Sequence, residues 1–202
     1  MSSNRDTILA TATRLFAERG LARTTTVMLA KEAGLSEGTL FRYFKNKENI
    51  FLELIRSLCE RITADVYKYL EVSRPQTGIE QICAVMRACF VFAGSNSNEF
   101  SLIFRDAPGR YCDPKGTPYE QFRYIVDLLK EHFRKGIETG KTDGSIKQDI
   151  DTSEMSSLLA GALIGVMRSI NLGFIENTEK MLPTMLQSVQ TLLEPKTRRR
   201  KG

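Results

Sequence analysis

Apolar residues recur along most of the chain at the three- and four-residue spacing of helices, and no convincing strand is expected. A first helix is predicted over about Arg5 to Arg19, with Gly20 at its end. From Lys47 to about Leu70 an apolar residue occurs at nearly every fourth position. This pattern predicts a helix roughly 36 Å long at 1.5 Å per residue, long enough to join two domains.

Between these two helices, the residues from 26 to 47 predict a helix, a tight turn and a second helix. Gly34 can adopt the left-handed conformation that ends a helix, Ser36 can cap the next helix and Asn46 can cap the long one. This is the layout of a helix-turn-helix. Leu40 and Phe44 supply the buried side of the second helix, whereas its remaining positions gather hydroxyl groups and positive charge, as expected of a helix that enters a phosphate-lined groove.

The run from Ala30 to Glu48 resembles the DNA-binding signature of the TetR family of transcriptional regulators, over about the first quarter of the chain. The resemblance implies an all-α fold. A three-helix DNA-binding domain at residues 1–50 would be joined by the long helix to a larger helical domain at 51–195, which binds an effector and forms a dimer. A basic tail at 196–202 follows.

The resemblance also implies which residues contact DNA. Phosphate contacts fall on the hydroxyl and ammonium groups of Thr25, Thr26, Thr39, Tyr43 and Lys47, and the chemistry of these groups agrees. The candidates for contacts to base edges are Glu37, Gly38, Phe41 and Arg42. Arg42 can pair with guanine, Glu37 can accept from cytosine, and Phe41 can touch a thymine methyl group. The family often has lysine and tyrosine in place of Glu37 and Phe41.

The last two predicted helices suggest how two copies of the chain meet. Besides a broad apolar stripe, the helix over Asp151–Leu172 has a second face of small residues, and the final helix has a matching stripe. The resemblance implies a two-fold four-helix interface that includes Gly161, Ile164, Gly165, Met185 and Val189. The alternative is that both stripes are core of one chain. Pro183 is expected to bend or delimit the final helix.

The larger domain contains many aromatic and methionine residues. In the family, this domain binds a small molecule that releases DNA, and the candidate pocket residues are Met86, Phe90, Phe104, Phe122 and Met167. An apolar or aromatic effector is expected, although each of these residues can also be plain core. Repression of transcription is likewise an implication of the resemblance.

Composition limits the alternatives. The 202 residues have a net charge of +5, and Met1–Lys47 contains eight basic and four acidic residues, so most of the excess charge lies in the predicted DNA-binding domain. The longest apolar run, Leu158–Met167, has about half the length of a membrane helix, so no membrane span is expected. The N-terminal segment has no uninterrupted apolar core of the signal-peptide type, so secretion is not expected. Four cysteines without paired short spacing and a single histidine offer no metal site, and a reducing cytoplasm is expected.

Three other classes of function were weighed. An enzyme is not expected, because the sequence has no phosphate-binding loop and its lone His132 lacks an evident partner motif; no cofactor is expected. A cysteine-based redox regulator would use Cys83, Cys89 or Cys112. A helical adaptor that binds only protein would leave the basic helix-turn-helix without a role.

Overall fold

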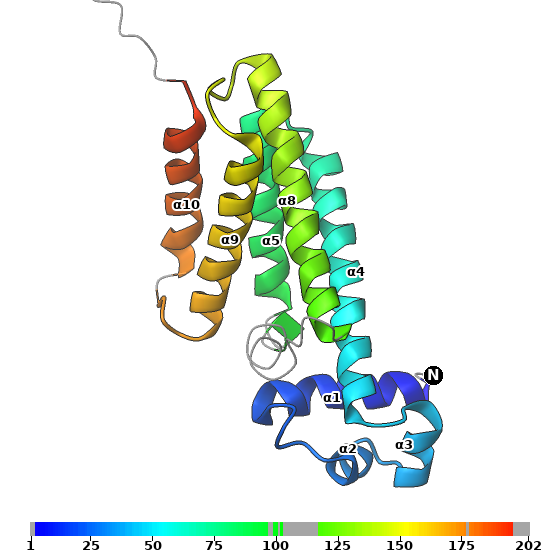
Figure 1. Ribbon diagram of the computed structural model, residues 1–202. Helices are drawn as coiled ribbons and strands as arrows, with labels where there is room; N and C mark the ends of the chain where they lie inside the picture. The colour runs from blue at the N-terminus through cyan, green and yellow to red at the C-terminus, as the bar shows by residue number, and fades with distance from the viewer. Residues whose placement is uncertain (1–2, 97–98, 101, 103–116, 177, 196–202) are drawn as a thin grey trace, which may run out of the picture. The chain divides into compact units, whose positions relative to one another are not determined.

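The computed structural model describes residues 3–96, 99–100, 102, 117–176 and 178–195, without the side chains of 117–122 and 178. Within these residues the chain forms α-helices and no strand, which confirms the predicted all-α class (Figure 1). The helices are α1 (Asn4–Arg19), α2 (Thr26–Glu32), α3 (Glu37–Tyr43), α4 (Lys47–Ser73), α5 (Gly78–Ser95), α8 (Thr117–Asp143), α9 (Thr152–Asn171) and α10 (Thr178–Leu193).

The chain divides into two compact units. The first comprises Met1–Arg61 and Ser95–Tyr124, and the second comprises Ile62–Gly94 and Ile125–Gly202. Helix α4 contains residues of both units. The domain boundary expected after residue 50 stays a prediction.

The core of the first unit forms where α1 packs against the start of α4. One face of α1 is apolar and buried, at the helical spacing of Ile8, Ala12, Leu15 and Phe16. The rings of Phe16 and Phe51 meet edge to face with centroids 6.1 Å apart. At the surface, Arg14 bridges to Glu32 of α2 at 2.8 Å and Arg5 bridges to Glu53 of α4 at 2.7 Å. The buried side chains described in this unit are therefore mainly apolar, and these two ion pairs lie outside that core.

The second unit is organised by a close approach between α5 and α8. A Cβ atom on Gly78 would lie 2.1 Å from the backbone nitrogen of Gly140, and one on Gly136 would lie 2.7 Å from Ile82. Gly140 fits the sequence pattern of a helix end, but α8 continues to Asp143 and the turn is made by Gly144 with φ +82°. Gly140 is a packing residue: a Cβ atom there would lie 2.5 Å from side-chain atoms of Ile146, in the loop that follows α8.

This contact predicts that alanine substitutions at two glycines of α5 change the free energy of unfolding in opposite directions. Gly78→Ala should lower the free energy of unfolding by about 2–3 kcal/mol, because its methyl group meets backbone atoms that cannot rotate away. Gly94→Ala, with no atom within 4 Å of the new methyl group, should stabilise α5 by about 0.5–1 kcal/mol. Denaturant titration of both variants measures the difference. Equal stabilities would contradict the close approach.

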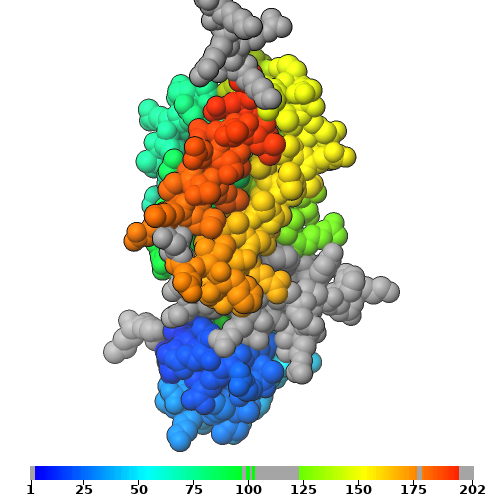
Figure 2. All heavy atoms as spheres, turned by 90° about the vertical axis from the view of Figure 1, so that its left-hand side faces the viewer, coloured from blue at the N-terminus to red at the C-terminus, as the bar shows by residue number. Residues whose placement is uncertain are grey.

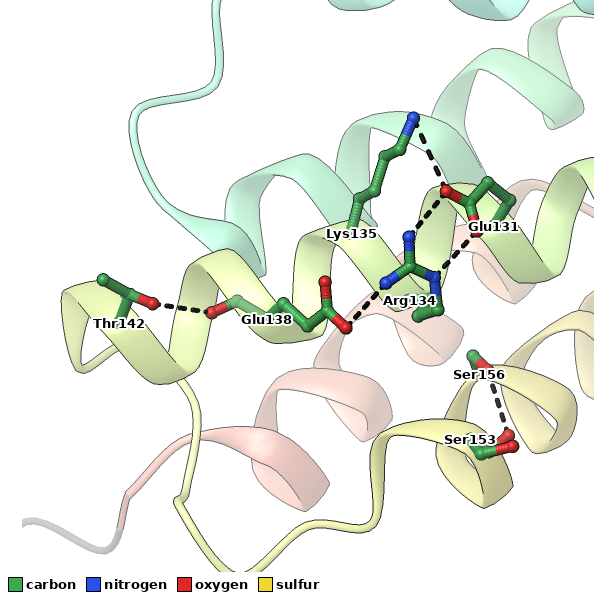
Figure 3. A network of polar contacts seen from close by, with 7 residues as sticks. All are labelled: Glu131, Arg134, Lys135, Glu138, Thr142, Ser153 and Ser156. Atoms are coloured by element: carbon green, nitrogen blue, oxygen red, sulfur yellow. Dashed lines mark hydrogen bonds and ion pairs between the residues drawn. The ribbon is translucent and has the colours of Figure 1, made fainter.

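Charged side chains along α8 form a chain of ion pairs on its solvent face (Figure 3). Arg134 contacts Glu131 at 2.7 Å and Glu138 at 2.6 Å. The hydrogen bonds from Arg134 lower the pKa of the Glu131 carboxyl to about 2. Because these groups are exposed, the pairs mark which face of α8 meets water and add little stability.

His132 lies on the opposite, buried side of α8 and is 5% exposed. Its ring meets that of Tyr67 in α4 edge to face, with centroids 5.0 Å apart. Its Nε2 atom is buried and has no hydrogen-bond partner among the described residues. Burial lowers the pKa of the imidazole, Lys135 lowers it further and Glu131 opposes the shift. The folded state therefore favours the neutral ring.

A histidine whose pKa is lower in the folded state binds more protons when unfolded. Its contribution to stability is therefore complete above its unfolded pKa of about 6.5 and is lost as the pH falls through the folded value. Since His132 is the sole histidine, the free energy of unfolding should fall between pH 7.5 and 5.5, as the unfolded state takes up a proton that the folded state binds more weakly. Denaturant titration at both pH values measures this fall. His132→Phe should remove it, and an equal fall in the variant would assign it to other groups.

Helix α5 is, by length and composition alone, apolar enough to cross a membrane. The expectation of no membrane span rested on a different segment, the apolar run Leu158–Met167. Its mean hydropathy is 1.2 and half of it is buried inside the protein. Buried core helices share these properties.

Helices α9 and α10 lie side by side and form one outer face of the second unit (Figure 2). Asp151 caps α9, accepting a hydrogen bond from the Glu154 amide at 2.8 Å. Pro183 lies inside α10 and does not delimit it. Lys147 ties the preceding loop to the end of α10, donating from its backbone to Leu193 at 2.9 Å and from its ammonium to Leu192 at 2.6 Å.

Candidate nucleic-acid interface

The helix-turn-helix is built by the capping residues expected from the sequence. Thr25 caps α2 by accepting a hydrogen bond from the Met28 amide at 3.2 Å, and Ser36 caps α3 by accepting from the Thr39 amide at 3.1 Å. Between them, Gly34 has φ +67°, the left-handed conformation expected of it. Asn46 caps α4 by accepting from the Asn49 amide at 2.8 Å. Each boundary of the motif is therefore set by a local hydrogen bond.

Helix α3 has one buried and one exposed side. Leu40 and Phe44 are buried, at 0% and 6% exposure, and fasten the helix to the first unit. The four predicted base-reading residues, Glu37, Gly38, Phe41 and Arg42, are all exposed. Phe41 is 49% exposed, which is unusual for a phenylalanine and leaves an apolar surface beside a guanidinium group. The exposed side of α3 thus combines an apolar surface with hydrogen-bonding groups, as base edges require.

The predicted phosphate-contacting residues flank this surface. Thr25 and Tyr43 are exposed, Thr26 and Thr39 are half-buried, and the Thr39 hydroxyl lies 2.9 Å from that of Ser36. Val27, near the start of α2, is 56% exposed. No sequence pattern singles out this exposed apolar side chain.

Lys47 occupies a different environment from the other predicted phosphate ligands. It is half-buried, and its ammonium group donates to the backbone carbonyls of Leu21 at 2.8 Å, Ala22 at 3.2 Å and Thr24 at 2.9 Å. These carbonyls belong to the connector between α1 and α2. A phosphate contact by Lys47 stays a prediction, and it would require the ammonium to leave at least one carbonyl.

A groove of about 380 Å³ lies beside Tyr43 in the first unit. Its lining includes Arg5, Asn49 and Arg56, together with Phe44, Leu52 and Glu53. Arg5 lies over the Phe44 ring, 5.6 Å from its centroid, and is paired with Glu53. No local sequence pattern indicates this groove, because its residues come from three separate segments: α1, the end of α3 and α4.

The predicted effector-pocket residues are partly in the core of the second unit. Met86 is fully buried, Met167 is 6% exposed and Phe90 is half-buried. Phe104 and the side chain of Phe122 lie outside the described residues. A groove of about 340 Å³ lies elsewhere in this unit, lined by Tyr69, Ser73, Pro75, Glu80, Cys83, Ala84, Arg87, Leu186 and Gln190. Met86, Phe90 and Met167, the three predicted pocket residues whose side chains are described, do not line it.

The predicted dimer-interface residues divide into two groups. Gly161 and Gly165 of α9 are exposed, Ile164 is half-buried, and no atom lies within 4 Å of a Cβ built on either glycine. By contrast, Met185 and Val189 of α10 are only 8% and 6% exposed in the single chain. Met185 and Val189 of α10 are therefore mostly covered within the single chain, whereas the small-residue face of α9 is open.

The described cysteines are poor redox sensors. Cys59, Cys83 and Cys89 are free and buried. Burial raises the pKa of the Cys59 and Cys89 thiols to about 12. It also raises the pKa of Cys83, against the opposing effect of Arg87. Because the thiolate is the reactive form, burial disfavours the reactive form of all three thiols. Cys112 lies outside the described residues.

Among the described residues, no group of three or more His, Cys, Asp or Glu side chains could hold a metal ion. An exposed helix preceded by a tight turn, braced by α1 and α4, defines instead a helix-turn-helix DNA-binding domain.

Comparison with known proteins agrees with this class. Residues 8–54 match the family described as bacterial regulatory proteins, tetR family. Over 190 residues the chain is 34% identical to the nucleoid occlusion factor SlmA of Vibrio atlanticus, covering 91% of this chain and 89% of SlmA. It is 28% identical over 156 residues to the HTH-type transcriptional repressor KstR2 of Mycolicibacterium smegmatis, covering 74% and 71% of the two chains.

Solved structures show the same fold. The ketosteroid transcriptional regulator KstR2 of Mycobacterium tuberculosis superimposes with a TM-score of 0.72 over 96% of this chain and 97% of KstR2, at 21% sequence identity. The chain belongs to the TetR family. It is a DNA-binding transcriptional regulator, as the sequence resemblance implied.

Proposed function

We propose that this protein is a repressor that binds a palindromic operator as a homodimer and is released from it by a small-molecule effector. The observation that carries the proposal is the exposed side of α3, where Glu37, Gly38, Phe41 and Arg42 are all accessible while Leu40 anchors the helix from behind. The similarity of the chain to the repressor KstR2 supports repression of transcription over activation.

In this proposal the residues of α3 divide by chemistry. Arg42 pairs with guanine through two parallel hydrogen bonds, Glu37 accepts from cytosine, and Phe41 packs on a thymine methyl group. Gly38 lets the DNA approach the backbone, since a Cβ there would meet only the Ser36 hydroxyl, at 3.8 Å. Thr25, Thr26, Thr39 and Tyr43 bind phosphates and fix the register of α3 in the major groove.

A dimer gives this short helix enough contacts to be specific. Two copies related by a two-fold axis would engage half-sites about one helical turn apart, roughly 34–36 Å. The open face of α9 around Gly161 and Gly165 suits the close approach of a second helix, and Ile164 between them is partly accessible. We place the two-fold axis at this face.

The effector is proposed to be an apolar or aromatic compound that acts on the second unit, in the reducing cytoplasm. The methionines in the core of this unit, Met86 and Met167, have adaptable side chains that can rearrange around a ligand. A relative that is called a ketosteroid transcriptional regulator agrees with an apolar class. Release requires that the effector bind the DNA-free state more tightly than the bound state.

Selection of duplexes from a random DNA pool, at two salt concentrations, tests this proposal. The expected result is an inverted repeat whose half-sites are about one turn apart, with an affinity that falls steeply as salt rises. Recovery of duplexes without a shared sequence would reduce the interaction to that of basic charge with phosphate. A helical adaptor that binds only protein would recover no duplex at all.

A further inference from the structure

We propose that Lys47 is a positioning residue for DNA binding: its ammonium group holds the connector between α1 and α2 and thereby positions Thr25 and Thr26, which follow the connector directly. The inference rests on the proposed function, which assigns phosphate contacts to these two threonines. It assigns to Lys47 a structural contact in place of the phosphate contact that the TetR resemblance implies.

The hydrogen bonds of Lys47 account for all of its donors. A lysine ammonium has three N–H groups and no acceptor, and the three carbonyls of Leu21, Ala22 and Thr24 lie 2.8, 3.2 and 2.9 Å from Nζ. No N–H group is left over for a phosphate oxygen. The positive charge is also surrounded by three carbonyl dipoles, which partly replace the water lost when the side chain becomes half-buried.

The connector is held from its inner side as well. Leu21 and Thr24 are fully buried, and the Thr24 hydroxyl donates to the carbonyl of Gly20 at 2.9 Å. The Leu21 carbonyl accepts from both Lys47 and the Thr24 amide, the latter at 3.4 Å. The buried side chains thus fix the connector toward the core, and Lys47 fixes its carbonyls toward α4.

The next residue along the chain is Thr25, the cap of α2. Its hydroxyl accepts from the Met28 amide at 3.2 Å and its carbonyl accepts from the Leu29 amide at 3.0 Å. A threonine hydroxyl contacts a phosphate only when it lies within hydrogen-bond distance of it, so the connector determines whether Thr25 and Thr26 can do so. Because Lys47 is the first residue of α4, its ammonium couples the first turn of that helix to the N-terminus of α2.

Replacing Lys47 with arginine or with methionine distinguishes a positioning role of this residue from a phosphate contact. A guanidinium binds phosphate at least as well as an ammonium does, so Lys47→Arg would preserve a phosphate contact. Its flat, wide group cannot converge on three carbonyls that an ammonium fits, so the same variant would not restore the connector. Lys47→Met removes the charge and keeps an unbranched side chain. Lys45→Met, at an exposed residue two positions earlier, removes the same charge and is the matched control.

The experiment compares these three variants with the wild type in the full-length protein, below the unfolding transition. Affinity for the duplex recovered by selection is measured as a function of salt, and hydrogen–deuterium exchange is measured for residues 21–30. We expect Lys47→Met and Lys47→Arg each to bind about tenfold more weakly. The dependence on salt should remain that of the wild type, and exchange at residues 21–30 should be faster. Lys45→Met should leave that exchange unchanged.

Two results would overturn the proposal. In the first, Lys47→Arg binds DNA like the wild type, Lys47→Met lowers the slope of log K against log salt by about 1.8, and neither variant changes the exchange. Lys47 would then be a phosphate ligand in each of two subunits. If the variants exchange faster yet bind DNA normally, the contact only stabilises the fold. Should no duplex be selected, the proposed function fails on its own. Unchanged exchange in both Lys47 variants would then still refute the positioning role.

Discussion

Replacing Arg42 with alanine should weaken binding to the selected operator by roughly 30-fold to 10⁴-fold and leave the fold intact. A bidentate contact with guanine contributes about 1–3 kcal/mol, and a dimer makes the contact twice, which gives about 2–6 kcal/mol in total. Arg42 is exposed and none of its contacts anchors α3, which is held by Leu40 and Phe44. Fluorescence anisotropy with a labelled duplex measures the loss, and denaturant titration checks the fold.

Arg19→Ala is the matched control for this prediction. It removes the same charge from an exposed position in the same unit, at the end of α1 and outside the helix-turn-helix. We expect it to weaken binding only slightly. Arg42→Ala should also relax the sequence preference at one base pair of each half-site. If the two arginine variants lose the same affinity and keep the same preference, α3 does not read bases through Arg42.

Leucine at Gly161 and Gly165 together should abolish the proposed dimer and with it the tight binding of the full operator. Both positions face open space in the single chain, so the two side chains should leave the protomer folded. Between two closely packed α9 helices the same side chains would force the backbones apart. Because a single recognition helix reads only one half-site, the affinity for the inverted repeat should fall by about 10²-fold to 10³-fold or more.

Analytical ultracentrifugation measures the oligomeric state of this double variant. Gly94→Leu provides the control, since a Cβ at Gly94 also meets nothing within 4 Å but lies on α5. The control should remain a dimer at concentrations where the double variant is a monomer. A double variant that still forms dimers would move the interface away from this face of α9.

The local features of the DNA-binding domain could be predicted from the sequence because each depends on neighbouring residues. A cap such as Ser36 bonds to an amide three residues away, and the left-handed turn at Gly34 follows from the absence of a side chain. The buried side of α1 follows in the same way from helical spacing. The all-α fold is a sum of such local signals.

Features that depend on residues far apart in the sequence could not be predicted from it. The carbonyls around Lys47 lie 23 to 26 residues earlier in the chain, and no local pattern joins them to α4. Gly140 has the sequence signature of a helix end, but α8 continues through it to Asp143, and the close approach of Gly78 to it has no local sequence signal. Likewise, the stripes of α9 and α10 look alike in sequence, and only burial separates the core residue Met185 from the open Gly161.

The most direct test of the central claim is the stoichiometry and affinity of the wild-type protein on the selected duplex, compared with a duplex in which one half-site is scrambled. If two recognition helices act together, native mass spectrometry should find two protomers on the intact repeat, and scrambling should cost about 10²-fold to 10³-fold in affinity. One protomer per duplex, with equal affinity for both duplexes, would contradict a dimeric reader of a palindromic operator.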